Sequence, residues 1–208
     1  MINKNINIEI FDNWALKDKD VGMEKGHAPA VDKMINIIDK RTTILKSQFS
    51  FLDLGCGNGW VVEKFSQNNL CTLAVGVDGA NNMIKKAKVR DTKGIYYKSN
   101  IEAWACNDKF DIIFSMETFY YFNDIDSVLK NIYNNLLKVN SFFIFGIDHY
   151  SENIPSLSWE SDIGIKTNTM SIDQWVNKIK SFGFRDVEYL VWGKKNDWNG
   201  TLIISAFK

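Results

Sequence analysis

The sequence contains little proline, histidine or cysteine, and these shortages exclude several kinds of site. Of its 208 residues, 2 are proline, 2 are histidine and 3 are cysteine. Cys56, Cys71 and Cys106 are an odd number without a C-x-x-C pair, so the sequence predicts neither a disulfide framework nor a zinc knuckle. We therefore expect no metal site.

Arginine is equally scarce, and the charges balance. The 25 lysines and arginines are matched by 25 acidic residues, and the arginines are Arg41, Arg90 and Arg185. Nucleic-acid binding needs a basic face, on which arginine is the preferred reader of phosphate and guanine. Because the lysines are scattered, we expect no nucleic-acid partner.

Long apolar runs are also missing. The most apolar run, residues 142–147, has the length of a strand, whereas a membrane helix needs about 20 apolar residues. Residues 1–6 lack the apolar region of a secretory signal. We therefore expect a cytoplasmic protein without a membrane partner, built as one domain or one domain with a small cap.

The most informative stretch is FLDLGCGNGW at residues 51–60, where an apolar run ends in three alternating glycines. A helical pattern follows, and strand, glycine loop and helix together hold nucleotide-like ligands at the carboxyl edge of a parallel sheet. A dinucleotide fingerprint is spaced G-x-G-x-x-G instead. Asp53, two residues before Gly55, would repel a diphosphate but suits a cationic ligand.

This stretch resembles the D/E-x-G-x-G-x-G signature of the class I, Rossmann-like S-adenosylmethionine (SAM) methyltransferases, whose ligand carries an amino group and a sulfonium. Further pieces follow in that family's order: an apolar run ending at Asp78, the stretch 110–116, and two alternating strands at the chain's end. The resemblance covers residues 45–208. It implies an α/β, doubly wound sheet of seven strands, mostly parallel with an antiparallel terminal strand, and an N-terminal helical lid over residues 1–44.

The resemblance also implies which residues bind SAM and its product S-adenosylhomocysteine (SAH). The glycine loop would hold the methionine part, Asp78 the ribose hydroxyls, and Met83 and Ile101 the adenine. Asn100 stands where the family commonly has an aspartate, and its carbonyl can still accept a hydrogen bond from the adenine amine. The expected cofactor-binding residues are Trp14, Asp53, Gly55, Cys56, Gly57, Asp78, Gly79, Met83, Asn100, Ile101 and Met116.

Local patterns predict several further elements. We expect a short helix near Ile10–Leu16, a turn over Val21–Pro29 and an amphipathic helix over Ala30–Lys40. Helical periodicity from Ile125 to Leu137 predicts one helix, and Ser141–Ile147 reads as a strand.

Candidate catalytic residues should face the acceptor at the carboxyl ends of the fourth and fifth strands and on the lid. Methyl transfer needs alignment and exclusion of water, and a general base only if the accepting atom carries a proton. The catalytic candidates are His27, Tyr121 and His149, the histidines because they titrate in a suitable range. Other residues expected to face the acceptor are Trp14, Glu24, Glu117, Tyr120 and Tyr150.

These observations favour a SAM-dependent methyltransferase that acts on a small-molecule acceptor, as a monomer or homodimer. Aromatic side chains at this place suit a partly apolar or cationic acceptor. The alternatives that stay open are a SAM- or SAH-binding module without activity and a protein methyltransferase. The alternating glycines with Asp53 argue against a third, a nicotinamide-dependent oxidoreductase.

Overall fold

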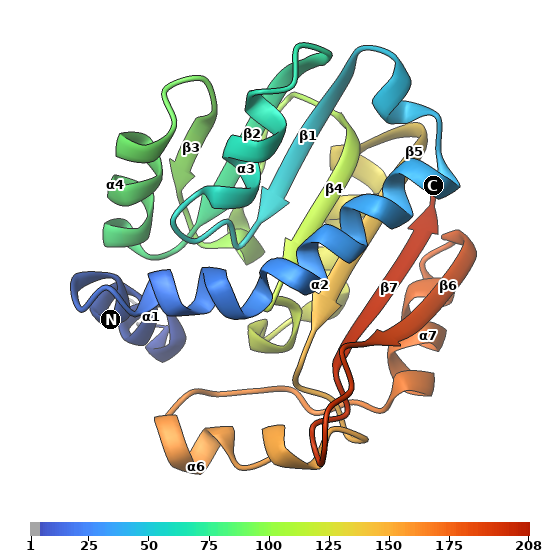
Figure 1. Ribbon diagram of the computed structural model, residues 1–208. Helices are drawn as coiled ribbons and strands as arrows, with labels where there is room; N and C mark the ends of the chain where they lie inside the picture. The colour runs from blue at the N-terminus through green and yellow to red at the C-terminus, as the bar shows by residue number, and fades with distance from the viewer. Residues whose placement is uncertain (1–4) are drawn as a thin grey trace.

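Seven strands pair into one sheet in the order β3-β2-β1-β4-β5-β7-β6 in the computed structural model, which describes residues 5–208 (Figure 1). β1 to β5 run parallel, and β7 runs antiparallel to β5 and β6. This confirms the predicted sheet. The strands are β1 (Phe49–Leu54), β2 (Cys71–Asp78), β3 (Ile95–Lys98), β4 (Phe110–Met116), β5 (Leu137–Ile147), β6 (Arg185–Trp192) and β7 (Thr201–Phe207).

Helices cover both faces of this sheet. They are α1 (Ile6–Leu16), α2 (Lys19–Arg41), α3 (Trp60–Ser66), α4 (Asn81–Arg90), α5 (Ile125–Asn131), α6 (Trp159–Ile163) and α7 (Ile172–Ser181). Phe49 and Phe51 of β1 pack with α2 and α3, whereas Leu52 and Leu54 belong to the core with α5 and α7. A parallel strand buried on both faces reads as a nearly continuous apolar run, as β1 does. No helix within residues 5–208 combines the length and apolar character needed to cross a membrane.

The turn predicted over Val21–Pro29 is wrong, because α2 continues as one helix from Lys19 to Arg41. Local preference favours a break here. Pro29 has no N–H for the carbonyl four residues earlier, and Gly22 and Gly26 each disfavour helix by about 1 kcal/mol relative to alanine. The helix therefore depends on contacts with the rest of the fold.

These contacts hold both halves of α2. In the first turns, Asp20 pairs with Lys86 of α4 at 2.6 Å, and Glu24 pairs with Arg90 at 2.8 Å. The later turns, which contain the predicted helix over residues 30–40, bury apolar side chains against the sheet: Val31, Met34, Ile37 and Ile38. Tertiary packing, which supplies most helix stability in proteins, overrides the glycines and the proline.

The helix predicted from Ile125 to Leu137 is too long. α5 ends at Asn131, a π-helical turn follows over Ile132–Leu136, and β5 begins at Leu137, before the predicted start at Ser141. Leu137 pairs with Phe110 at the start of β4. The apolar side chain of Leu137 fits both the helical spacing and a buried strand position. Pairing with β4 places this residue in the strand.

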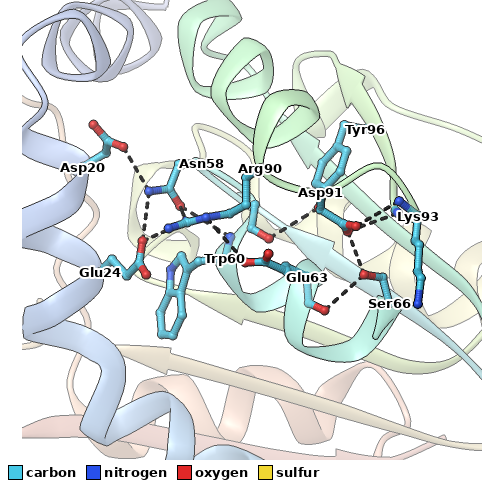
Figure 2. Close-up of polar contacts among 12 residues, drawn as sticks. Asp20, Glu24, Asn58, Trp60, Glu63, Ser66, Arg90, Asp91, Lys93 and Tyr96 are labelled. Atoms are coloured by element: carbon cyan, nitrogen blue, oxygen red, sulfur yellow. Dashed lines mark hydrogen bonds and ion pairs between the residues drawn. The ribbon is translucent and has the colours of Figure 1, made fainter. Parts of the chain in front are cut away.

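Asp91, directly after α4, joins α3, α4 and β3 through its carboxylate (Figure 2). The hydroxyls of Ser66 and Tyr96 donate to it at 2.7 and 2.9 Å, and the backbone N–H groups of Lys93 and Gly94 donate at 2.9 and 3.1 Å. Burial by itself would raise the pKa of Asp91, but these hydrogen bonds lower it below its ordinary value. The hydrogen bonds of Asp91 therefore fix α3, the helix that follows the glycine loop.

Gly22→Ala is expected to raise the free energy of unfolding by roughly 0.5–1 kcal/mol, measured by urea denaturation. No atom lies within 4 Å of a Cβ added there, so the methyl group meets open space in a helix. Gly59→Ala is the matched control with the opposite sign, because Gly59 has a φ of +82° and its Cβ would lie 2.7 Å from that of Ala87. A loss of stability in Gly22→Ala would contradict the continuous helix.

Asp91→Asn is expected to flatten the pH dependence of stability below about pH 4. A carboxyl whose folded pKa lies below its unfolded value stabilises the fold above the unfolded value, and this contribution disappears as the pH falls through the folded pKa. Urea unfolding between about pH 2.5 and pH 6 measures the slope, with the exposed Asp39→Asn as control. Equal slopes for Asp91→Asn and the unsubstituted protein would refute the role of this carboxylate.

Candidate functional site

A cavity lies at the carboxyl ends of β1, β2 and β4, and residues 5–28, here called the capping segment, supply part of its lining. Figure 1 shows α1 and the first turns of α2 beside these strand ends. This segment contains α1 and the first turns of α2. Of the eleven residues expected to bind a cofactor, ten line the cavity: Asp53, Gly55, Cys56, Gly57, Asp78, Gly79, Met83, Asn100, Ile101 and Met116.

Trp14 does not line the cavity. It packs edge-on against Phe11, with the ring centroids 5.3 Å apart, and Nζ of Lys19 lies 5.0 Å from its ring. Phe11, one turn earlier in α1, lines the cavity in its place. The α1 periodicity did not distinguish these two aromatic residues.

The glycine loop allows the loop after β4 to come very close. Gly55 has a φ of +83°, and a Cβ at this position would lie 1.9 Å from Oγ1 of Thr118. Gly57 has a φ of +52°, but no atom lies within 4 Å of its Cβ position. The backbone at Gly57 therefore faces open space that a ligand can occupy.

Two aspartates lie at the ends of β1 and β2 at this edge, Asp53 buried and Asp78 half-buried. Oδ2 of Asp78 accepts a hydrogen bond from the backbone N–H of Gly57 at 3.0 Å, and Oδ1 accepts one from Ala80 at 2.7 Å. Asp53 is 2% exposed, and its Oδ1 has no partner among the described residues. Burial raises the pKa of both carboxyls, so a cationic or hydroxyl-bearing ligand would stabilise their charged forms. The amino group, sulfonium and ribose of SAM fit this set of groups.

The apolar side chains expected to hold the adenine, Met83 and Ile101, both line the cavity. Met83 is buried and Ile101 is half-buried. A Cβ at Gly79 would lie 2.5 Å from Cδ1 of Ile8, so glycine lets α1 close directly over this end. Oδ1 of Asn100 accepts a hydrogen bond from the backbone N–H of Glu102 at 3.2 Å.

Asn58, between the second and third glycines, ties the loop to the capping segment (Figure 2). Its Nδ2 donates to Asp20 at 2.9 Å and to Glu24 at 3.2 Å. Its Oδ1 accepts from Nη1 of Arg90 at 2.8 Å, and Arg90 also pairs with Glu24. This network holds α2, the glycine loop and α4 together around the cavity.

On the acceptor side, His27 and Tyr121 line the cavity, as does Glu117. Glu117 has a φ of +57°, which is uncommon for a residue other than glycine. Its Oε1 accepts from the backbone N–H of Asp148, and its Oε2 accepts from the hydroxyl of Tyr120 at 2.6 Å. Strained backbone of this kind clusters at functional sites.

His27, Glu117 and Asp148 form one polar group. Nε2 of His27 lies 3.9 Å from Oδ2 of Asp148, and one nitrogen or oxygen atom from each of the three residues lies within 4.8 Å of the others. Burial raises the pKa of both carboxyls. Burial also lowers the pKa of His27, although the charge of Asp148 opposes this shift. The imidazole is therefore able to accept a proton near neutral pH.

His149, the other histidine candidate, lies away from the cavity lining. It is 1% exposed, with Nδ1 3.0 Å from the carbonyl of Ser156 and Nε2 2.8 Å from Oγ1 of Thr169. Tyr120 and Tyr150, which were expected to face the acceptor, are also buried outside the lining, whereas Glu24 and Glu117 line it.

Sequence reasoning missed Asp20, Asn58 and Asp148 as site residues. Asp148 could have been found, because it directly follows the apolar strand β5 as Asp78 ends β2. Asp20 lay in the supposed turn, so its place on a helix face was not foreseen. Asn58 needed knowledge of where the capping segment packs.

Asn58→Ala is expected to loosen the capping segment without unfolding the sheet. Because it removes hydrogen bonds to two carboxylates and a guanidinium, amide hydrogen exchange over residues 21–27 should become about tenfold faster or more. Asn69→Ala, an exposed asparagine outside this network, is the control. Unchanged exchange in Asn58→Ala would mean that the network does not hold the cap.

Comparison with known proteins agrees with this geometry. Residues 52–145 match the family model of a methyltransferase domain. The malonyl-[acyl-carrier protein] O-methyltransferase of Bacillus anthracis is 29% identical over 157 residues, which are 73% of this chain and 57% of that protein. Its Bacillus cereus counterpart is 30% identical over 141 residues, 61% of this chain and 52% of that protein. The chain therefore spans little more than half the length of these curated relatives.

Solved structures share the fold along most of the chain. A chain from the complex between the Haloferax volcanii Trm112 methyltransferase activator and a methyltransferase has a TM-score of 0.79 and 21% identity, covering 95% of this chain and 96% of that one. The N-methyltransferase NodS from Bradyrhizobium japonicum WM9, solved with SAH, has a TM-score of 0.63 and 16% identity over 79% of this chain and 81% of that one. Residues 52–145 thus match a methyltransferase domain, and the sheet order and glycine loop give the chain the fold of the class I SAM-dependent methyltransferases.

Proposed function

We propose that the protein transfers a methyl group from SAM to a small-molecule acceptor. The observation that carries this proposal is that one capped cavity contains both kinds of group that the reaction needs. The glycine loop with Asp53 and Asp78 lies on one side, and His27 with Glu117 lies on the other.

The cofactor side follows from the geometry of the loop. Backbone groups at Gly55 and Gly57 would hold the methionine part, with Asp53 facing its positive charge. Asp78, already oriented by two backbone N–H groups, would accept hydrogen bonds from the ribose hydroxyls. Bound SAM supplies a methyl group on a sulfonium, which needs no further activation by the protein.

The acceptor side supplies alignment and a proton acceptor. We assign His27 as the base, because its imidazole lines the cavity and its side chain is 25% exposed, so a proton can pass on to water. Tyr121 would shape the acceptor site, with its ring 5.2 Å from that of Phe11. His149, whose ring nitrogens both have partners, would support Tyr120 from behind.

The capping segment lies over the cavity, which suits a small acceptor. We keep the expectation that residues 1–44 act as a lid over the domain at 45–208, of which residues 1–4 lie outside the described residues. A second candidate acceptor is a malonyl group on an acyl-carrier protein, which the names of the curated relatives favour. Binding without catalysis is the remaining alternative, and methyl transfer from labelled SAM to a panel of small acceptors decides between them.

Asp78→Asn is expected to weaken SAM and SAH binding by about tenfold or more, since a hydrogen bond to a charged group is worth about 1.5–3 kcal/mol. Calorimetric titration with SAM, SAH and NAD measures this. The unsubstituted protein should bind the first two and not the third. Asp32→Asn, on the exposed side of α2, is the control. Tight NAD binding without a response to SAM would overturn the proposed function.

A further inference from the structure

The cavity is strongly one-sided in charge. Among the described residues that line it, there are five acids and no lysine or arginine. The acids are Asp20, Glu24, Asp53, Asp78 and Glu117. Buried carboxylates need hydrogen-bond donors or a partner of opposite charge, because leaving water destabilises their charged forms. The partners of each acidic side chain therefore show which acid is left for a ligand.

The acids of the capping segment are neutralised from outside the cavity. Asp20 pairs with Lys86 and Glu24 pairs with Arg90. Figure 2 shows Arg90 reaching across to Glu24 beside Asn58. These two acids close the cap and leave no charge for a ligand.

Asp53 and Asp78 lie at the glycine loop, where the proposed function places the positively charged and hydroxyl groups of SAM. Neither forms an ion pair with a lysine or arginine in the described chain. Bound SAM would supply a positive charge to Asp53 and hydroxyl donors to Asp78. They therefore require no second ligand.

Of the five lining acids Glu117 remains, and Asp148 lies next to it just outside the lining. Among the residues described, neither pairs with lysine or arginine, and His27 is the basic side chain beside them. The side chain of Asp148 is 10% exposed, and its Oδ1 has no hydrogen-bond partner in the described chain. An unpartnered oxygen this deeply buried, within 4.8 Å of two cavity-lining residues, marks a place for a donor that the chain does not supply.

We infer that the methyl acceptor is an amine that enters as its ammonium ion, binds between Glu117 and Asp148, and gives up a proton to His27 before methylation. This inference rests on the proposed function, because it names the substrate class of the same site. An ammonium group supplies the positive charge that is missing beside the two carboxylates. It also supplies the hydrogen-bond donors that Asp148 Oδ1 needs.

Aromatic neighbours favour an organic cation over a metal ion. Tyr121 and Phe11 both line the cavity, with ring centroids 5.2 Å apart, and ring faces attract ammonium groups and the carbon chains attached to them. Both oxygens of Glu117 already accept hydrogen bonds. Each of these oxygens has a further lone pair, with which it can accept a hydrogen bond from an ammonium N–H.

The step balances without another reagent. The ammonium nitrogen loses one proton to Nε2 of His27, and its freed electron pair forms the new N–C bond to the methyl carbon. The C–S bond breaks, with its electron pair remaining on sulfur. The products are an N-methylammonium ion, SAH and one proton, which leaves from His27 at the exposed edge of the cavity.

Three probes with one skeleton test the inference: phenethylamine, 2-phenylethanol and 3-phenylpropanoate, titrated calorimetrically into the SAH complex. Phenethylamine should bind about tenfold tighter than the alcohol or better, and the carboxylate should bind weakest. Glu117→Gln and Asp148→Asn should each remove the preference for the amine while leaving SAH affinity within about twofold. Both variants should fold with an equal or higher Tm, because each removes a destabilised buried charge. Asp39→Asn, an exposed change of the same kind, should change nothing.

The failures are distinguishable. If the protein does not bind SAH, the proposed function fails and this inference fails with it. If SAH binds but the alcohol or the carboxylate binds as well as the amine, the inference alone is overturned. A preference for the amine that survives both substitutions overturns the assignment of Glu117 and Asp148. Micromolar binding of Mg²⁺ or Zn²⁺ that both substitutions abolish, with no amine preference, would make the group a metal site instead.

Discussion

The parallel pairing of β1 with β2 on one side and β4 on the other is the constraint on which the site depends. Parallel neighbours end at the same edge of a sheet, and at β1 the chain order turns from one direction to the other, which opens a crevice between the following loops. The register places Asp53 opposite Gly76 of β2 and Phe114 of β4. The glycine loop, Asp78 and Glu117 consequently emerge side by side.

Carboxylates in this molecule divide by how completely the chain satisfies them. Asp91 receives four hydrogen bonds and has a lowered pKa, so it stabilises the fold. Asp53, Glu117 and Asp148 have raised pKa values, chiefly because of burial. Both oxygens of Glu117 accept hydrogen bonds, whereas Oδ1 of Asp53 and Oδ1 of Asp148 have no donor among the described residues. A buried carboxylate whose hydrogen-bond donors are all present stabilises the fold. A buried carboxylate that lacks a donor indicates ligand binding instead.

Much of the fold and the cofactor side could be predicted from the sequence, because both depend on short-range signals. Asp53 and the alternating glycines lie within one loop, and the apolar strands are bounded by polar residues that mark their ends. The capping segment was harder, since α2 contains Pro29 and two glycines and forms through ion pairs to distant residues such as Lys86 and Arg90. Asp148 and His27 are far apart in sequence, so no local pattern indicates that they meet.

The single helix α2 has a mechanical consequence for how ligands enter. Its later turns are anchored in the sheet core, and its first turns form part of the cap. Pro29, between the two, leaves the carbonyl of Lys25 without its helical hydrogen bond, so the helix bends most easily there. A bend at Pro29 would move the first turns of α2 relative to the later turns, and the ion pairs to Lys86 and Arg90 of α4 oppose this movement. Added salt screens such charges and would therefore weaken this resistance.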